Sequence, residues 1–187
     1  MYWFLIPLLV GFAFAVASAF TAAYSRRFGE RGGRLTTAVL RNLVGIPLWL
    51  MGFIMAWQAP SPRLWASHAM SAPRAWILIT IGSVLVVWGH LQLGWRTHMP
   101  SVRDTLVRHG LYAHVRHPIY AGSVPIFVGL ALLKPTGTVV VACAIAIAWL
   151  FVQARLEEID LLQRLPAYRG YMQEVPGFVP WWRRKRS

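Results

Sequence analysis

The residues of this sequence that could do chemistry are concentrated in residues 110–122, which combine two imidazoles, a guanidinium and two phenols with an apolar run that follows directly. Pro118 lacks an N–H group, which costs nothing in the first turn of a helix, so a membrane helix is expected to begin at His117 or Pro118. The free N–H groups and the positive end of that helix would then lie beside Arg116, His117 and Tyr120. This arrangement suits an anion.

The opposite charge is expected from a distant pair of carboxylates. A helix that starts near Pro118 and rises about 1.5 Å per residue would turn at the Pro-Gly step and return to the same depth near residue 153. Glu157 and Glu158 should therefore lie level with Arg116 and His117, in a dipolar site that suits a zwitterionic ligand. Neighbouring helical residues point about 100° apart, so only one glutamate should enter the site, and the spacing leaves open which one. The plain alternative is an interfacial salt bridge.

The composition indicates that these groups are positioned by membrane helices. The chain has 187 residues, of which 57% are hydrophobic, and it contains ten tryptophans. A soluble domain of this length would not be so apolar. We therefore expect an all-α integral membrane protein. Cys143 is the single cysteine, so no disulfide framework exists, and its place in an apolar run predicts a small buried hydrophobe.

The apolar runs predict about five transmembrane helices. The last two are joined by Lys134, Pro135, Thr136 and Gly137, which predicts a helical hairpin. The polar stretches 24–41 and 96–116 are expected to be loops, and Pro47 predicts a kink in the second span. The expected spans are residues 2–23, 42–58, 75–94, 119–133 and 138–152.

The basic residues predict the orientation in the membrane. With the N-terminus outside, sixteen of the nineteen Lys and Arg residues face the cytoplasm, as do all six carboxylates. The positive-inside rule therefore favours an N-out, C-in topology, in a membrane that we expect to be the bacterial inner membrane. The formal net charge of +13 then reflects orientation and attraction to anionic lipid headgroups, so nucleic acid is not an expected partner.

Other kinds of site find little support in the sequence. The histidines lack the paired spacing of a zinc site, so no metal is expected. There is no Gly-x-Gly-x-x-Gly or Walker loop, and nothing suggests a Ser-His-Asp triad. His90, near the end of the third span, is interpreted as a residue that hydrogen-bonds in helix packing.

Two separated motifs together resemble a known family. The first is Gly110-x-Tyr112-x-x-x-Arg116-His117-Pro118-x-Tyr120-x-Gly122, and the second is Arg155-x-Glu157-Glu158-x-x-Leu161, followed by Tyr168-x-x-Tyr171, Val175-Pro176 and Pro180. Across residues 92–180 the chain resembles the isoprenylcysteine carboxyl methyltransferase family, which is itself similar to the phospholipid N-methyltransferases. The resemblance implies a membrane enzyme that uses S-adenosylmethionine.

The resemblance also implies roles for particular residues. An arginine ahead of the first glutamate is associated with the methyl acceptor in such enzymes, which makes Arg155 a catalytic candidate together with Arg116. Here Arg155 stands two residues before Glu157, and Gln153 stands four before it. The residues expected to bind the donor are Thr105, Leu106, Val107, Tyr112, His117, Pro118, Ile119, Tyr120, Glu157 and Glu158.

The predicted organisation is one membrane domain with two functional parts. Residues 1–95 should form three helices that serve as scaffold and acceptor side, and residues 96–187 should supply the cofactor-binding loop, the hairpin and an amphipathic C-terminal segment. The predicted reaction is methylation of a carboxylate or thiol of a lipophilic acceptor, at a site facing the cytoplasm. Three alternatives remain open: N-methylation of an amino phospholipid, an NADPH-dependent membrane reductase of related architecture, and a non-catalytic membrane protein.

Overall fold

The structure, a computed structural model, describes residues 2–66 and 71–180, and the regular structure of these residues is helical, which confirms the all-α class. The basic segment at 181–187 lies outside the described residues. In chain order the elements are α1 (Leu5–Ala17), α2 (Thr21–Ala38), the π-helix η1 (Val39–Gly45), α3 (Ile46–Gln58), α4 (Ser71–Leu93), the 3₁₀ turns η2 (Gly94–Thr97) and η3 (Gly110–Ala113), α5 (Pro118–Leu133), α6 (Gly137–Arg164) and α7 (Tyr168–Glu174).

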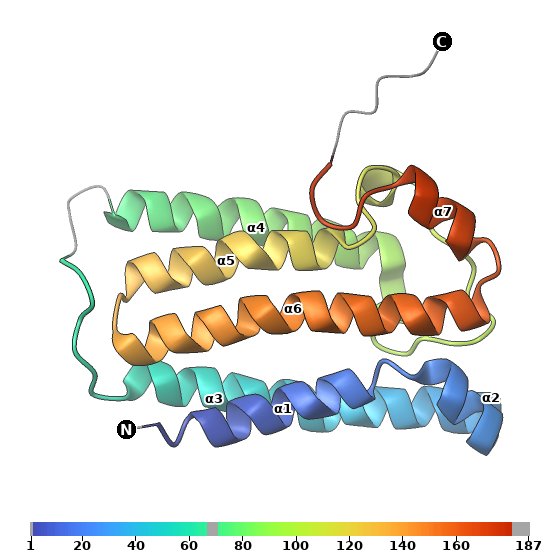
Figure 1. The fold of residues 1–187 in the computed structure, drawn as a ribbon, viewed down its shortest axis with the longest axis horizontal. Coiled ribbons are helices and arrows are strands. Elements are labelled where there is room, and N and C mark those ends of the chain that lie inside the picture. The colour runs from blue at the N-terminus through green and yellow to red at the C-terminus, as the bar shows by residue number, and fades with distance from the viewer. Residues whose placement is uncertain (1, 67–70, 181–187) are drawn as a thin grey trace, which may run out of the picture.

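Five apolar helical segments run along the long axis of the described molecule (Figure 1). Three of them are long and apolar enough to cross a membrane: Thr21–Gln58, Ser71–Thr97 and Gly137–Arg164. The other two, α1 and α5, are shorter, with 13 and 16 residues. The predicted all-α membrane protein is therefore confirmed, and α5 and α6 form the expected hairpin.

The prediction of a loop at residues 24–41 is wrong. These residues are helical, and α2, η1 and α3 form one stretch of 38 residues. The single break within it is at Gly29, whose φ of 72° lies in the region that favours glycine. Low hydropathy indicates that a segment leaves the membrane, but Arg, Glu, Ala and Leu are good helix formers, so the backbone stays helical beyond the apolar run. Pro47, where a kink was predicted, is the second residue of α3, which begins directly after the π-helical segment.

Glycines bring α4 and α5 into close contact. A Cβ atom added at Gly122 would lie 2.8 Å from the carbonyl oxygen of Gly82, and one at Gly129 would lie 2.7 Å from that of Ala75. Small residues at facing positions let two membrane helices approach backbone to backbone. This pair forms one side of the bundle, with α1 and α3 on the other side and α6 between them (Figure 1).

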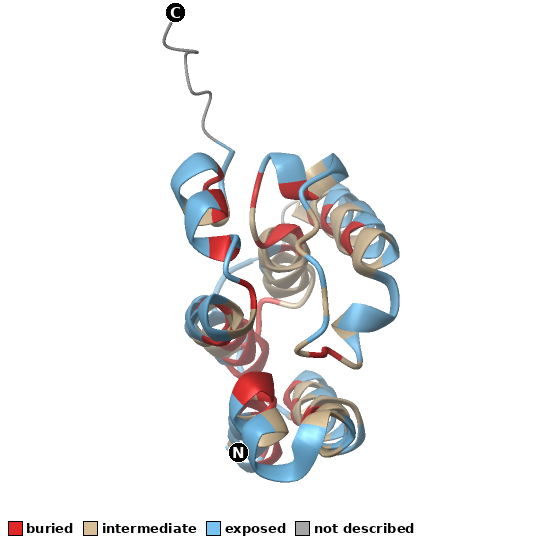
Figure 2. Ribbon diagram, turned by 90° about the vertical axis from the view of Figure 1, so that its right-hand side faces the viewer, coloured by how far each residue is buried: buried red, intermediate tan, exposed pale blue. Residues whose placement is uncertain are grey.

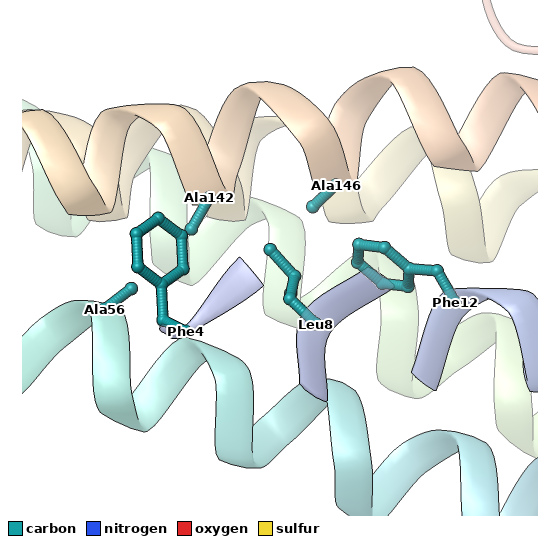
Figure 3. Packing of buried hydrophobic residues seen from close by; sticks show 6 residues of the cluster. All are labelled: Phe4, Leu8, Phe12, Ala56, Ala142 and Ala146. Atoms are coloured by element: carbon teal, nitrogen blue, oxygen red, sulfur yellow. The ribbon is translucent and has the colours of Figure 1, made fainter. Parts of the chain in front are cut away.

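The main apolar core lies where α1 packs on α3 and α6. Leu8 and Phe12 of α1, with Phe4 just before the helix, point toward Ala56 of α3 and toward two alanines of α6, Ala142 and Ala146 (Figure 3). Much of the outer surface of the helices is exposed in the isolated chain (Figure 2). Many of these exposed side chains are large and apolar. Exposed apolar surface on this scale is expected of helices that face lipid.

The two ends of the bundle differ in character. One end carries the α5–α6 turn and residues 59–66, which follow α3, and the N-terminus lies there as well (Figure 1). The other end carries α2, α7 and residues 94–117, and we call it the loop end. The motif residues of the sequence lie at the loop end.

Candidate active site

The hairpin brings the two motifs together. His117 caps the start of α5, and its Nε2 atom lies 3.0 Å from Oε1 of Glu158 on α6. Arg116 donates to the same oxygen through Nε at 2.9 Å and Nη2 at 2.8 Å. The register predicted from helix rise is therefore found in the structure, and the two groups expected beside an anion contact a carboxylate of the protein itself.

The segment after α7 holds these groups in place. The backbone N–H groups of Arg116 and His117 donate to the carbonyls of Pro176 and Gly177, at 2.8 and 3.0 Å. Nη1 of Arg116 donates to the carbonyl of Val175 as well. The Arg116–Glu158 pair is thus surrounded by protein partners, which indicates that it fixes the C-terminal segment against the hairpin.

Glu157 has a different environment from its neighbour. Its Oε1 atom accepts three hydrogen bonds: from Tyr120 Oη at 2.7 Å, from Gln153 Nε2 at 2.9 Å and from Arg41 Nη2 at 3.0 Å. Its Oε2 atom has no hydrogen-bond partner in the described part of the chain. One oxygen therefore positions the carboxylate, and the other remains available as an acceptor.

A cavity of about 410 Å³ lies beside Glu157 at the loop end. That volume is in the range of small-molecule sites. Glu157 lines the cavity, whereas Glu158 and Pro118 are not among the lining residues. Among the predicted site residues, those that line it are Thr105, Leu106, Val107, Tyr112, Arg116, His117, Ile119, Tyr120 and Glu157.

Arg155 is placed apart from this group. Its side chain is 69% exposed, and its nearest carboxylate contact is Glu158 Oε2 at 3.6 Å. It is not among the residues that line the cavity. The structure therefore brings Arg116 to the cavity wall but leaves Arg155 on the outside of α6.

Arg41 is a site residue that the sequence reasoning missed. It lies in the π-helix η1, and besides Glu157 it contacts the Thr97 carbonyl at 2.8 Å and Ser18 Oγ at 3.2 Å. Arg41 thereby links α6 both to the end of α1 and to the turn that follows α4. An arginine at the edge of an apolar run, which usually has a specific partner in the protein, was the available signal.

A second ion-pair cluster positions the irregular segment between η2 and η3. Arg164 donates to Asp160 at 2.7 Å, to Asp104 at 3.3 Å and to the Ser101 carbonyl at 2.8 Å. Leu106 packs against Leu165 and its apolar neighbours on α7. These contacts hold the irregular segment after α4 over the cavity, so that residues 105–107 become part of its wall.

Tyr112 and Tyr171 at the loop end are buried, and burial keeps their phenols protonated. Burial, with a smaller contribution from the charge of Glu157, raises the pKa of Tyr112 well above its ordinary value. Burial also raises the pKa of Tyr171 to about 12, against the opposing effect of Arg116 and Arg108. Tyr171 Oη donates to the carbonyl oxygen of Tyr112 at 2.6 Å. At neutral pH both phenols are therefore hydrogen-bond donors.

Comparison with known proteins identifies the family. The sequence profile of a family described as phospholipid methyltransferase matches residues 72–167, just over half of the chain. The chain belongs to the phospholipid methyltransferase family. The match runs from α4 through α6 and so includes the hairpin, the loop over the cavity and both glutamates. The resemblance found in the sequence is therefore confirmed.

A curated relative gives a second comparison. Methanethiol S-methyltransferase 1 of Bradyrhizobium diazoefficiens is 28% identical over 163 residues, which are 81% of this chain and 55% of that protein. The chain thus spans about half the length of the curated relative that it matches. No solved structure matches the chain.

Proposed function

We propose that this protein is an integral membrane methyltransferase that uses S-adenosylmethionine to methylate the thiol of a small lipophilic acceptor. The family supports the reaction class, and the name of the curated relative favours sulfur over a carboxylate or an amine as the acceptor atom. The charge distribution favours an inner-membrane location with the loop end facing the cytoplasm. Water then reaches the cavity from the side on which the donor is dissolved.

The observation that carries this proposal is the convergence of the predicted donor-binding residues on one cavity. Residues 105–107 come from the loop, Tyr112 from η3, Tyr120 from α5 and Glu157 from α6, and all line the same space. Residues 105–120 are close along the chain, whereas Glu157 is separated from them by the α5–α6 hairpin and reaches the same cavity through the fold. The cavity therefore fits a cofactor of mixed apolar and polar character.

The unpaired oxygen of Glu157 is an acceptor that matches the polar groups of S-adenosylmethionine. S-adenosylmethionine carries an ammonium, a sulfonium and two ribose hydroxyls, each of which is attracted by or donates to a carboxylate oxygen. Oε2 of Glu157 has no partner among the described residues, whereas Oε1 has three. We infer that Oε2 holds one of these donor groups, and that Tyr112 and Tyr120 provide aromatic walls.

Bound S-adenosylmethionine would supply an activated methyl group: a new C–S bond to the acceptor sulfur would form as the donor's methyl–sulfur bond broke, and the electron pair of the broken bond would remain on the donor sulfur. The protein needs to place the two sulfurs in line and to exclude competing water. The thiol proton must also leave. Because Oε1 of Glu157 already accepts three hydrogen bonds and Oε2 is assigned to the donor, we propose that this proton passes to water at the loop end.

The experiment that tests the proposal is calorimetric binding of S-adenosylmethionine and S-adenosylhomocysteine to detergent-purified protein, with NADPH as the competing cofactor. We expect both adenosyl compounds to bind and NADPH not to bind. Glu157→Gln should weaken donor binding by about 10-fold to 100-fold, because it removes a charge-assisted hydrogen bond. Glu174→Gln is the matched control, since Glu174 pairs with Arg108 and does not line the cavity.

Two outcomes would contradict this proposal. Well-folded protein that binds neither adenosyl compound would exclude the donor, and binding of NADPH in their place would favour a reductase. Full donor affinity in Glu157→Gln would remove Glu157 from the site and leave the family assignment intact.

A further inference from the structure

His90 is an imidazole at the cavity wall that the proposed donor site does not use. It lines the cavity together with Val86 and Leu93, and the spacing of these three residues places them on one face of α4. The exposed outer surface of the same helix carries Trp88 and Leu91 instead. The half-buried ring of His90 is therefore directed toward the cavity, where it can accept a proton.

The hydrogen bonding of this ring determines which of its nitrogens carries the proton. Nδ1 lies 2.8 Å from the carbonyl oxygen of Val86, one turn earlier in α4. A carbonyl oxygen can only accept, so Nδ1 carries the hydrogen and the neutral ring has its lone pair on Nε2. Nε2 has no hydrogen-bond partner among residues 2–66 and 71–180, and unlike Nε1 of Trp149 it retains accessible surface. His90 thus presents an unused acceptor.

His90 lies at the depth of the proposed donor site. A Cβ atom added at the preceding residue, Gly89, would lie 3.5 Å from the backbone nitrogen of Ile119 on α5. The next residue of α5, Tyr120, lines the cavity and donates to Glu157 at 2.7 Å. The imidazole is therefore level with the residues that we assign to the donor.

The carboxylates of the cavity wall are already engaged. Asp104 and Asp160 both pair with Arg164, at 3.3 and 2.7 Å. Glu157 has three donors on one oxygen, and we assign its other oxygen to S-adenosylmethionine. None of these three carboxylates is thus left to take a proton from the acceptor.

Two other imidazoles line the cavity in different surroundings. Nε2 of His117 lies 3.0 Å from Glu158, and the ring is stacked on Tyr120 with centroids 5.7 Å apart. His98 is exposed at the loop end, and its ring centroid lies 6.1 Å from that of His90. His117 therefore belongs to the buried ion pair, and His98 shows that water reaches the neighbourhood of His90.

We propose that Nε2 of His90 is the general base that takes the thiol proton of the acceptor. This inference rests on the proposed function. The S–H bond breaks with its electron pair left on sulfur, and the proton forms an N–H bond at Nε2, which makes the ring an imidazolium. The thiolate then forms the new C–S bond, and the imidazolium returns to the neutral ring by giving its proton to water at the loop end.

The test compares two acceptors of similar size that differ in acidity. Near neutral pH benzyl mercaptan is mostly protonated, whereas thiophenol is mostly ionised, so only the first requires a base. Methylation is measured with the whole chain in nanodiscs and with S-adenosylmethionine supplied. We expect His90→Gln to slow methylation of benzyl mercaptan by about 100-fold and that of thiophenol by less than about threefold.

The matched control is His114→Gln, because His114 is exposed and does not line the cavity. It should change neither rate. Binding of S-adenosylhomocysteine to each variant shows that the fold and the donor site are intact.

A measurement on the unsubstituted protein decides the case if His90→Gln does not fold. Calorimetric binding of benzyl mercaptan to the complex with S-adenosylhomocysteine, in two buffers of different ionisation enthalpy, counts the protons released. A base in the cavity keeps the proton in the complex, so we expect no release. Release of about one proton per bound thiol would show that the acceptor enters as a preformed thiolate and would overturn the inference.

Two results from the variants would also overturn the base role and leave the methyl transfer intact. One is an equal loss of activity toward the two thiols in His90→Gln, and the other is a selective loss for benzyl mercaptan in His98→Gln alone. Methylation of neither thiol by the unsubstituted protein would contradict the proposed function itself, and the inference with it.

Discussion

At the scale of single residues, the adjacent carboxylates of α6 have separate environments. Glu158 is buried against Arg116 and His117, while Glu157 lines the cavity with one oxygen unpaired within the described chain. A rotation of about 100° per residue is enough to point them at different neighbours. A carboxylate in a buried ion pair and a carboxylate that lines a cavity can therefore stand side by side in the sequence.

Tyr171 makes the stability of the loop end depend on pH. Its pKa is raised from 10.0 to about 12, chiefly by burial. Between these pH values the unfolded chain has lost the phenolic proton and the folded protein keeps it, so unfolding releases a proton and stability falls as pH rises. Below pH 10 this contribution is fully present. Thermal unfolding in detergent should therefore show a melting temperature that drops above about pH 10.

The variant Tyr171→Phe tests this assignment. It should cost about 1 kcal/mol near neutral pH, because the hydrogen bond to the Tyr112 carbonyl is lost, and the drop at high pH should be shallower. Tyr2→Phe, at an exposed position, is the control. An unchanged pH profile in Tyr171→Phe would show that another group causes the alkaline loss.

At the scale of elements, the site depends on how closely α4 approaches α5. The glycines of this interface remove the side chains that would separate the helices. Close packing positions Val86 and His90 of α4 on the cavity wall opposite α6. His90 also hydrogen-bonds within its own helix, to the Val86 carbonyl at 2.8 Å.

A methyl group at this interface should be destabilising. In Gly122→Ala the new Cβ would lie 2.8 Å from the Gly82 carbonyl oxygen, so the helices must move apart. We expect a loss of about 1 to 3 kcal/mol and weaker donor binding, measured by thermal unfolding with and without S-adenosylhomocysteine. Gly170→Ala is the control, because an added Cβ there meets nothing within 4 Å. Equal stability of the two variants would contradict the close approach.

At the scale of the whole molecule, the site and the basic residues share one end. The described arginines of α2, of the loop over the cavity and of α7 lie at the loop end, opposite the α5–α6 turn. Arg63 and Lys134 lie in the connections at the other end. This distribution is what the positive-inside rule predicts for a protein whose loop end faces the cytoplasm.

Cysteine labelling tests the orientation. In a Cys143→Ala background, Arg63→Cys should react with a membrane-impermeant maleimide in intact spheroplasts, and Arg169→Cys should react only after permeabilisation. Both arginines are exposed in the structure, whereas Cys143 is buried, so accessibility reports the side of the membrane. The reverse pattern would contradict the N-out, C-in topology.

The sequence by itself determined the features that follow from distance along the chain. Apolar runs predicted the membrane helices, and helix rise through the hairpin predicted that Arg116 and His117 would lie level with Glu157 and Glu158. Both inferences use the constant geometry of a helix, which does not depend on distant residues. Hydropathy gave a wrong prediction at residues 24–41, because it reports depth in the membrane and not backbone conformation.

Only the tertiary structure decided the features that depend on helix rotation and on distant contacts. It determined that Glu157 lines the cavity while Glu158 holds Arg116, and that Arg41 reaches Glu157 from a π-helix 116 residues away. It also left Arg155 exposed and Gln153 Oε1 buried without a hydrogen-bond partner among the described residues. The rotation of a helix and the partner of a buried arginine are set by the packing of the whole bundle, which no local pattern in the sequence records.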